Sequence, residues 1–193
     1  PAFKEAGAIL DTLVTSGGIS GVHHGNKNQF TTASTEAEDL WNNNKINTVS
    51  IVTRHDAHAE QVVDALNSGK NIFVEKPLAL TLDELDIIDE AYHEANKSNT
   101  VRLMVGFNRR YAPHIVKMKE LLNSHRSPKS IIMTVNAGAI PGEHWVQNSL
   151  IGGGRIIGEG CHFIDLMRHL IGHKINGFTA TMIGNVPGVE VRE

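Results

Sequence analysis

The clearest pattern of apolar and polar positions lies between Asn47 and Thr81. Two short runs rich in β-branched and aromatic residues, Val49 to Thr53 and Asn71 to Val74, are typical of strands. Between them, apolar residues recur at the i, i+3, i+4, i+7 spacing of a helix, at positions 59, 62, 63 and 66. The stretch is therefore predicted to be a strand–helix–strand unit whose two strands run parallel and end at the same edge of a sheet.

Polar side chains follow both strands of this unit. Thr53, Arg54, His55 and His58 come after the first strand, and Glu75, Lys76 and Pro77 come after the second. Ligands of open α/β sheets bind beyond the carboxyl ends of the strands, so we expect a binding site at this edge. Pro77 restricts the residue before it, which places Lys76 on a stiff backbone. A solvated lysine at a strand-to-helix turn is the alternative interpretation.

The rest of the chain predicts further helices and strands. Helices are expected over residues 1–6, 19–28, 35–43, 82–96 and 112–123, and from Glu159 onward. Strands are expected over residues 8–14, 30–31, 101–105, 130–137 and 178–183. Strands that alternate with helices are typical of α/β proteins with a parallel sheet.

Composition limits the classes of function. The 193 residues fit one large or two small domains. The single cysteine, Cys161, excludes a disulfide framework, and no secretory signal or apolar run of ~18 residues is present, so we expect a soluble protein of a reducing, cytoplasmic compartment. Eighteen basic and 21 acidic residues give a formal charge of −3 without long runs of either sign, which disfavours nucleic acid or a membrane as partner.

The region from Ile151 to Gly172 carries a second polar cluster. Glycines 152 to 154 lack the lysine and hydroxyl context of a P-loop, so a turn is expected there. Polar residues of the helix that follows share one face, at positions Glu159, His162, Asp165 and His169. The face is either a solvated stripe or, with its Glu-x-x-His spacing, half of a metal site whose second copy is absent from the sequence.

Four motifs together resemble the Gfo/Idh/MocA family of nicotinamide-dependent oxidoreductases. They are Thr-Arg-His-Asp-Ala-His (53–58), Val-Glu-Lys-Pro-Leu-Ala-Leu-Thr (74–81), Gly-Phe-Asn-Arg-Arg-Tyr-Ala-Pro (106–113) and Gly-Gly-Gly-Arg-Ile-Ile-Gly-Glu-Gly-Cys-His-Phe-Ile-Asp (152–165). The resemblance implies a Rossmann-type doubly wound parallel sheet in a dinucleotide-binding domain, residues 1–106. It implies an α+β substrate domain with an open sheet, residues 107–193, through which subunits of a homo-oligomer pair.

The resemblance also implies the chemistry and the residues that perform it. Members oxidise or reduce a secondary alcohol or carbonyl of a sugar, inositol or sugar nucleotide, with NAD or NADP. The implied catalytic residues are Lys76 and His162. The implied cofactor contacts are Ser16, Thr53, Arg54, His55, His58, Glu75, Lys76 and Pro77. The predicted substrate contacts are Asn108, Arg109, Glu159, Asp165 and Trp145, of which Trp145 is either a stacking surface for a sugar or a core residue. No metal ligand is implied.

The sequence departs from the family in three places. Many members carry an aspartate four residues before the catalytic histidine, where this chain has Gly158, and both Glu159 and Asp165 are alternative carboxylate partners for His162. Ser16 stands where an acidic residue usually binds the ribose, so the choice between NAD and NADP stays open. The glycine-rich turn of the family would precede residue 1, so we expect a fragment that lacks this turn and the C-terminal part.

Two other classes of function are compatible with the same residues. Metal-dependent hydrolysis or lyase chemistry could use His55, His58 and the polar face that starts at Glu159. A non-catalytic binding fragment is the third possibility, because the glycine-rich turn is missing.

Overall fold

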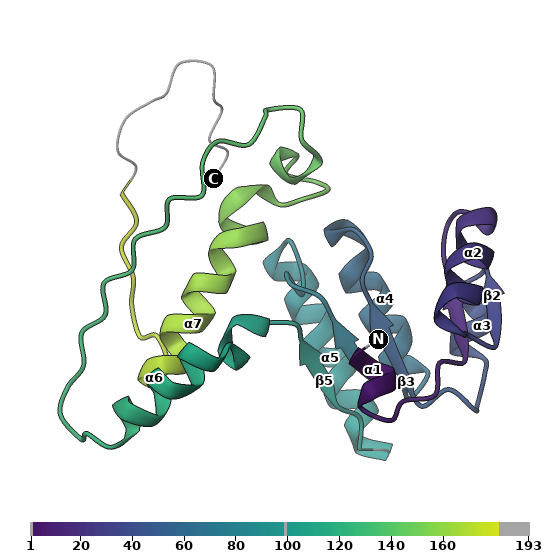
Figure 1. Cartoon of the computed structure of the whole chain (residues 1–193), viewed down its shortest axis with the longest axis horizontal. Helices are drawn as coiled ribbons and strands as arrows, with labels where there is room; N and C mark the ends of the chain where they lie inside the picture. Colours follow the sequence, from purple (N-terminus) through teal and green to yellow (C-terminus); the bar gives the residue numbers. More distant parts are fainter. Residues whose placement is uncertain (1, 99, 182–193) are drawn as a thin grey trace.

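The computed structural model describes residues 2–98 and 100–181, and its strands form two parallel sheets. The first pairs β1 (Thr12–Val14) with β2 (Thr32–Ser34), and the second has the order β3 (Thr48–Ile51), β4 (Asn71–Val74), β5 (Leu103–Val105). Each pair of neighbouring strands is parallel, with Ile51 opposite Val74 and Val74 opposite Val105. The predicted parallel α/β architecture is confirmed, but its strands lie in two sheets (Figure 1).

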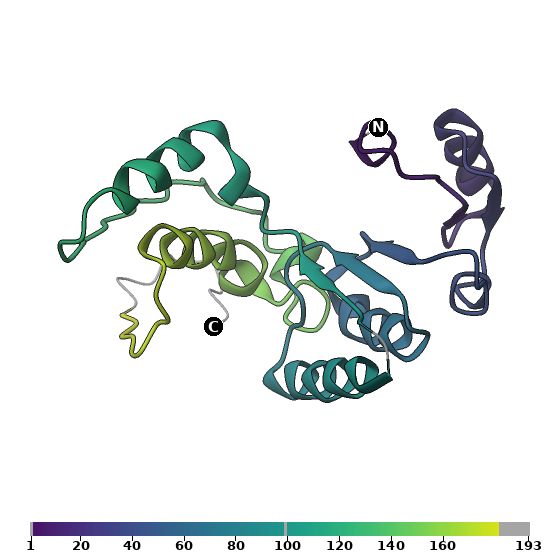
Figure 2. The ribbon, with the colours of Figure 1, turned by 90° about the horizontal axis from the view of Figure 1, so that it is seen from below.

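The three-stranded sheet and two helices form the main hydrophobic core. Helix α4 (His58–Asn67) and helix α5 (Leu82–Ser98) lie on the same side of this sheet (Figure 2). The core includes Val62, Leu66, Val74 and Ile88, each at most 3% exposed. The predicted helical spacing between the two strands therefore marks the face of α4 that packs on the sheet. At the start of α5, Thr81 and Glu84 form a capping box: each backbone N–H donates to the other side chain, both at 3.1 Å.

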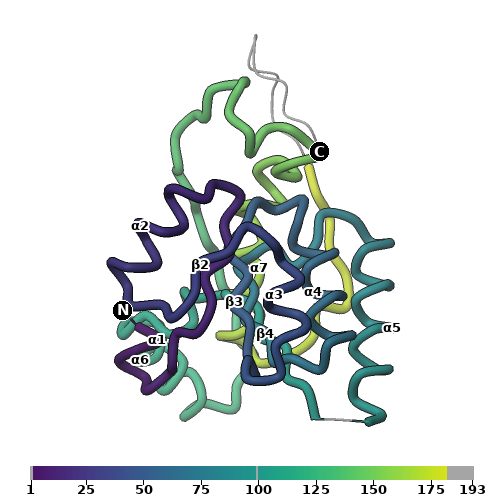
Figure 3. Tube along the Cα trace, turned by 90° about the vertical axis from the view of Figure 1, so that its right-hand side faces the viewer, coloured from purple at the N-terminus to yellow at the C-terminus, as the bar shows by residue number. Residues whose placement is uncertain are grey.

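The opposite side of this sheet carries the short helix α1 (Ala2–Glu5), whose Phe3 ring meets Phe73 of β4 edge-on at 5.8 Å. Helix α2 (Gly18–Asn28) connects β1 and β2, and α3 (Glu38–Trp41) follows them; Figure 3 shows α1 and α2 on the other side of the strands from α5. Helices thus cover both sides of the strands, as expected for a doubly wound fold. Strand β2 begins two residues later than predicted, and α3 is shorter than the predicted helix over 35–43.

The chain after Gly106 forms helices and irregular segments. They are the 3-10 helix η2 (Asn108–Tyr111), α6 (Pro113–Asn123), the 3-10 helix η3 (Trp145–Gln147), the π-helix η4 (Ile156–Gly160) and α7 (Cys161–Ile171). Helices α6 and α7 lie side by side, away from α2 and β2 (Figure 1). None of the helices in the described ranges is long and apolar enough to cross a membrane.

The predicted open sheet does not form among described residues 107–181. Residues 130–137 are irregular, so the strand expected there is wrong. Ile132 is 93% exposed, because no neighbouring strand within the described part supplies the hydrogen bonds and apolar cover that a strand needs. Of the strand expected over 178–183, residues 178–181 are irregular, and the last two lie outside the described residues.

Candidate active site at the strand ends

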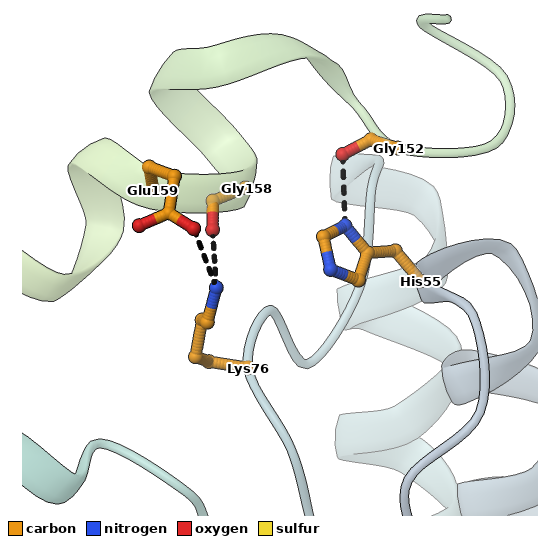
Figure 4. Close-up of polar contacts among 5 residues, drawn as sticks. All are labelled: His55, Lys76, Gly152, Gly158 and Glu159. Atoms are coloured by element: carbon orange, nitrogen blue, oxygen red, sulfur yellow. Dashed lines mark hydrogen bonds and ion pairs between the residues drawn. The ribbon is translucent and has the colours of Figure 1, made fainter. Parts of the chain in front are cut away.

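Lys76 and His55 leave the carboxyl ends of neighbouring parallel strands and point to the same segment of the second part of the chain. Lys76 Nζ donates to the Gly158 carbonyl at 2.6 Å and lies 3.4 Å from Glu159 Oε1. His55 Nδ1 donates to the Gly152 carbonyl at 2.9 Å. Figure 4 shows both side chains rising toward the segment that contains these carbonyls. The fold therefore joins two motifs that are about 80 to 100 residues apart in sequence.

The three glycines form a tight turn, as predicted. The backbone N–H groups of Gly152 and Gly153 both donate to the Asn148 carbonyl, at 2.8 and 3.1 Å. A Cβ atom on Gly152 would lie 2.4 Å from Val146 Cα, and Gly153 and Gly154 have φ values of 76° and 75°. A side chain is excluded at the first position, and left-handed backbone favours glycine at the other two. The turn directs the Gly152 carbonyl toward His55.

Helix α7 is preceded by a π-helical turn that the sequence pattern does not indicate. The helix predicted from Glu159 becomes α-helical only at Cys161, whose N–H donates to the Ile156 carbonyl, five residues back. Such wide turns are frequent at functional sites. Here the turn carries the Gly158 carbonyl and the Glu159 carboxylate that meet Lys76.

His162 lies in the first turn of α7 and is 7% exposed. Its Nδ1 atom is buried and has no hydrogen-bond partner among the described residues. Burial lowers the pKa of His162, and the positive charges of Lys76 and Arg109 lower it further. The imidazole is therefore neutral at neutral pH and able to accept a proton.

Asp165 is not the partner of His162. Its carboxylate accepts hydrogen bonds from two nitrogens of Arg110, Nε at 2.6 Å and Nη2, and Asp165 is 7% exposed. This hydrogen bonding raises the pKa of Arg110. The predicted role of Asp165 as an orienter of His162 is therefore corrected, because its oxygens bind η2 to α7; its predicted contact with the substrate stays a prediction.

His58 is fully buried, with both ring nitrogens directed at backbone carbonyls. Nδ1 lies 2.7 Å from Pro77 O and Nε2 lies 3.1 Å from Thr53 O. The predicted contact between His58 and a cofactor is corrected, because neither nitrogen is free. The ring instead connects the loops that follow β3 and β4, which carry His55 and Lys76.

We expect His58→Ala to lower the free energy of unfolding by about 1–3 kcal/mol, the cost of leaving buried polar groups without partners. Chemical denaturation of the purified protein measures this change. His93→Ala is the matched control, since His93 lies on the exposed side of α5 beside Asp89, and we expect a change within about 0.5 kcal/mol. Equal stabilities of the two variants would contradict the connecting role of His58.

The other predicted contacts fall into two groups. Trp145 meets the His55 ring edge-on at 4.8 Å, and Glu75 lies close to Gly106, where an added Cβ would be 3.0 Å from its Oε2. The structure thus gathers Trp145 and Glu159 with His55 and Lys76. Outside this group, Ser16 is exposed after β1 in the two-stranded sheet.

The remaining predicted residues lie at the borders of the site. Thr53 donates its hydroxyl to Gln61 Oε1 at 2.9 Å, and Arg54 is exposed. Asn108 is exposed at the start of η2, and the Arg109 guanidinium lies 4.7 Å from the centre of the Phe163 ring. Arg110 and the Gly152 and Gly158 carbonyls were not predicted from the sequence. Arg110 follows another arginine, Arg109, and the sequence does not distinguish the two. The directions of the backbone carbonyls have no signal in the sequence.

Side chains gathered at the carboxyl ends of parallel strands, with helices on both sides, define an α/β protein of the nucleotide-binding class. Residues 17–107 match the family model described as "Oxidoreductase family, NAD-binding Rossmann fold". Over these residues the chain belongs to the Gfo/Idh/MocA oxidoreductase family, as the resemblance of its motifs predicted.

Two curated relatives show the extent of the similarity. Oxidoreductase P35 of Formosa agariphila is 31% identical over 193 aligned positions, which cover 91% of this chain and 57% of that protein. The scyllo-inositol 2-dehydrogenase (NAD(+)) of Bacillus subtilis is 35% identical over 133 positions, covering 67% of this chain and 36% of that protein. The matched segments therefore span 57% of the first relative and 36% of the second, less than two thirds of either protein.

Solved structures show the same fold. A levoglucosan dehydrogenase in complex with NADH and levoglucosan superposes with a TM-score of 0.73 at 23% identity, over 85% of this chain and 45% of that one. A probable dehydrogenase from Thermotoga maritima superposes with a TM-score of 0.74 at 22% identity, over 90% of this chain and 51% of that one.

Proposed function

We propose that the protein is a nicotinamide-dependent oxidoreductase that interconverts a secondary alcohol and a carbonyl on a sugar, inositol or sugar-nucleotide substrate. The proposal rests on one contact: Lys76, at the end of β4, donates a hydrogen bond to the segment that leads into His162. The charge of Lys76 acts on His162 and lowers its pKa, and a cation and a neutral imidazole in one region can stabilise an alkoxide and accept its proton. Family membership and the inositol dehydrogenases among the relatives support the reaction class.

The residues at the strand ends fit a dinucleotide. Thr53 and Arg54 offer an exposed hydroxyl and guanidinium after β3, and Glu75 offers a carboxylate after β4. The buried Nδ1 of His162, which has no hydrogen-bond partner among residues 2–98 and 100–181, lies on the first turn of α7. We propose that these strand-end residues, with His55, Pro77 and Ser16, hold NAD or NADP. When bound, the nicotinamide supplies or accepts a hydride.

The protein's own residues handle the charge and the proton. An ammonium has three N–H groups. Two acceptors lie beside Lys76 Nζ, namely the Gly158 carbonyl and the Glu159 carboxylate. A third N–H is left to donate to the substrate oxygen, where it stabilises negative charge as the bond to hydrogen breaks. The neutral imidazole of His162 takes the hydroxyl proton in oxidation and returns it in reduction.

The proposal also assigns roles to the two parts of the chain. Residues 1–106 bind the dinucleotide, and residues 107–193 bind the substrate and pair subunits in a homo-oligomer. Assembly of subunits and a cytoplasmic location are further parts of the proposal. Analytical ultracentrifugation of the purified protein measures the first, and a fluorescent fusion in cells reports on the second.

We expect the purified chain to bind NADH or NADPH with a Kd between about 1 μM and 1 mM, the usual range of substrate affinities. Isothermal titration calorimetry and nicotinamide fluorescence measure binding independently. Ser16 carries a hydroxyl and not a carboxylate. The ratio of the NADH and NADPH affinities is therefore measured in the wild type and in Ser16→Asp, and a change in this ratio shows that the position selects the cofactor.

Two results would count against the proposal. Folded chain that binds neither nucleotide would contradict it, and so would binding that is the same after Lys76, Thr53 and Arg54 are all replaced by alanine. The metal-dependent alternative has little support in the structure, because ring nitrogens of both His55 and His58 already face backbone carbonyls. Metal analysis of untreated protein tests it directly.

A further inference from the structure

A side chain at position 158, where many family members carry an aspartate, would be crowded in this chain. A Cβ atom on Gly158 would lie 3.3 Å from the Gly152 carbonyl oxygen and 3.3 Å from His55 Cε1. Both distances are tighter than ordinary contacts, and an aspartate would add a carboxylate beyond the Cβ. The hydrogen bond between His55 and Gly152 holds both neighbours in place. A carboxylate in this site must therefore come from another position.

Glu159 supplies a carboxylate next to this position. Its side chain is one methylene longer than aspartate, and its Oε1 lies 3.4 Å from Lys76 Nζ. Lys76 is 14% exposed and Glu159 is 45% exposed, so the ion pair lies between the buried site and the surface. The other nearby acid, Asp165, is paired with Arg110. Among the described residues, Glu159 is the acid that forms an ion pair with Lys76.

His162 has a different environment. Its buried Nδ1 has no partner in the described part of the chain, and its ring packs edge-on against Phe107 at 6.2 Å. The carboxylate of Glu159 therefore contacts the lysine of the site and makes no hydrogen bond to His162 Nδ1, and its charge raises the pKa of His162 only against the larger lowering by burial.

We propose that Glu159 is the positioning residue of Lys76, and that its carboxylate acts on the reaction through the lysine and not through His162. This inference rests on the proposed function of the same site. The π-helical turn presents the Gly158 carbonyl and the Glu159 carboxylate together, so two acceptors fix the direction of the ammonium. Its remaining N–H is thereby aimed at the substrate oxygen.

The first test measures turnover of a polyol substrate by variants of Glu159. We expect Glu159→Gln to lower kcat about 10-fold or more, because a misdirected catalytic group loses rate, while the KM for the nucleotide stays unchanged. Glu159→Asp keeps the charge and should recover a large part of the rate. The control Glu120→Gln removes the acid of an exposed ion pair with Lys117 on α6 and should have no effect.

Double variants identify the residue through which Glu159 acts. When Lys76 is already methionine, we expect Glu159→Gln to change kcat/KM less than about twofold. When His162 is already asparagine, we expect Glu159→Gln to cause its full loss. The reverse pattern would overturn the inference, as would a Glu159→Gln rate equal to that of Glu120→Gln.

A second readout does not depend on activity. Acylation of lysines by an N-hydroxysuccinimide ester, followed peptide by peptide in mass spectrometry, reports how firmly each ammonium is held. We expect Glu159→Gln to raise the rate at Lys76 about threefold or more relative to Lys117, and Glu159→Asp to keep the wild-type rate. An unchanged rate would overturn the inference. If no polyol is turned over, the proposed function fails and this labelling still decides whether Glu159 positions Lys76.

Discussion

We expect His162→Asn to lower turnover of a polyol substrate by about 10²–10⁴-fold, the usual contribution of a general acid or base. Asparagine keeps much of the shape of the imidazole but cannot take a proton. Under the proposed function, the buried imidazole of His162 receives the proton of the substrate. Steady-state absorbance of NADH or NADPH at saturating substrate measures the change. A loss of less than 10-fold with intact substrate affinity would refute the role.

The role of His162 also predicts how kcat/KM changes with pH. Burial lowers the pKa of His162 below its ordinary value of 6.5, so the imidazole of the folded protein stays neutral until the pH falls below this lowered pKa. We expect kcat/KM for oxidation to fall as the pH decreases through the lowered pKa and to be constant above 6.5 as far as this group is concerned.

A matched control separates His162 from other histidines. The control His169→Asn, on the same helix, should keep both the rate and the low-pH decrease. In His162→Asn the decrease should disappear. A decrease that persists in this variant would show that another group titrates.

We expect Lys76→Met to lower kcat/KM by about 10²–10³-fold, the usual cost of removing one preorganised donor to a developing negative charge. Methionine matches the length of the lysine stem and has no N–H group. Nucleotide binding by the variant, measured by calorimetry, and its thermal midpoint show whether the loss comes from the chemical step.

Two further variants sharpen this prediction. Lys117→Met, on the exposed side of α6, should be fully active. Lys76→Arg keeps the charge, but its planar fork is directed differently from an ammonium, so we expect little recovery. Full activity of Lys76→Arg would show that charge alone suffices, and full activity of Lys76→Met would exclude the lysine from the reaction.

The strand–helix–strand unit could be predicted from sequence because its signals are local. Apolar residues such as Val62 and Leu66 repeat at helical spacing, and the same residues pack on the sheet. The polar edge followed from the rule that parallel strands joined by a crossover end together. The sequence predicted only that these polar side chains gather at one edge of the sheet. The structure adds their hydrogen-bond partners.

The remaining features depend on tertiary contacts. The choice of Arg110 over Arg109 as partner of Asp165 depends on how η2 packs against α7, and adjacent arginines look alike in sequence. The burial of His58 follows from the positions of two loops that meet only in the fold. The strand expected over 130–137 has the right composition, but a strand exists only when another strand pairs with it.

The contacts of His55 and Lys76 with Gly152 and Gly158 have a mechanical consequence. They are hydrogen bonds between the strand ends and the segment that leads into α7, and the Asp56 N–H adds a third, to the Ile151 carbonyl at 3.2 Å. A hinge movement that opens this junction must break the same bonds that aim the lysine. Under the proposed function, an open molecule is thus an inactive one, and closure commits the bound substrate to reaction.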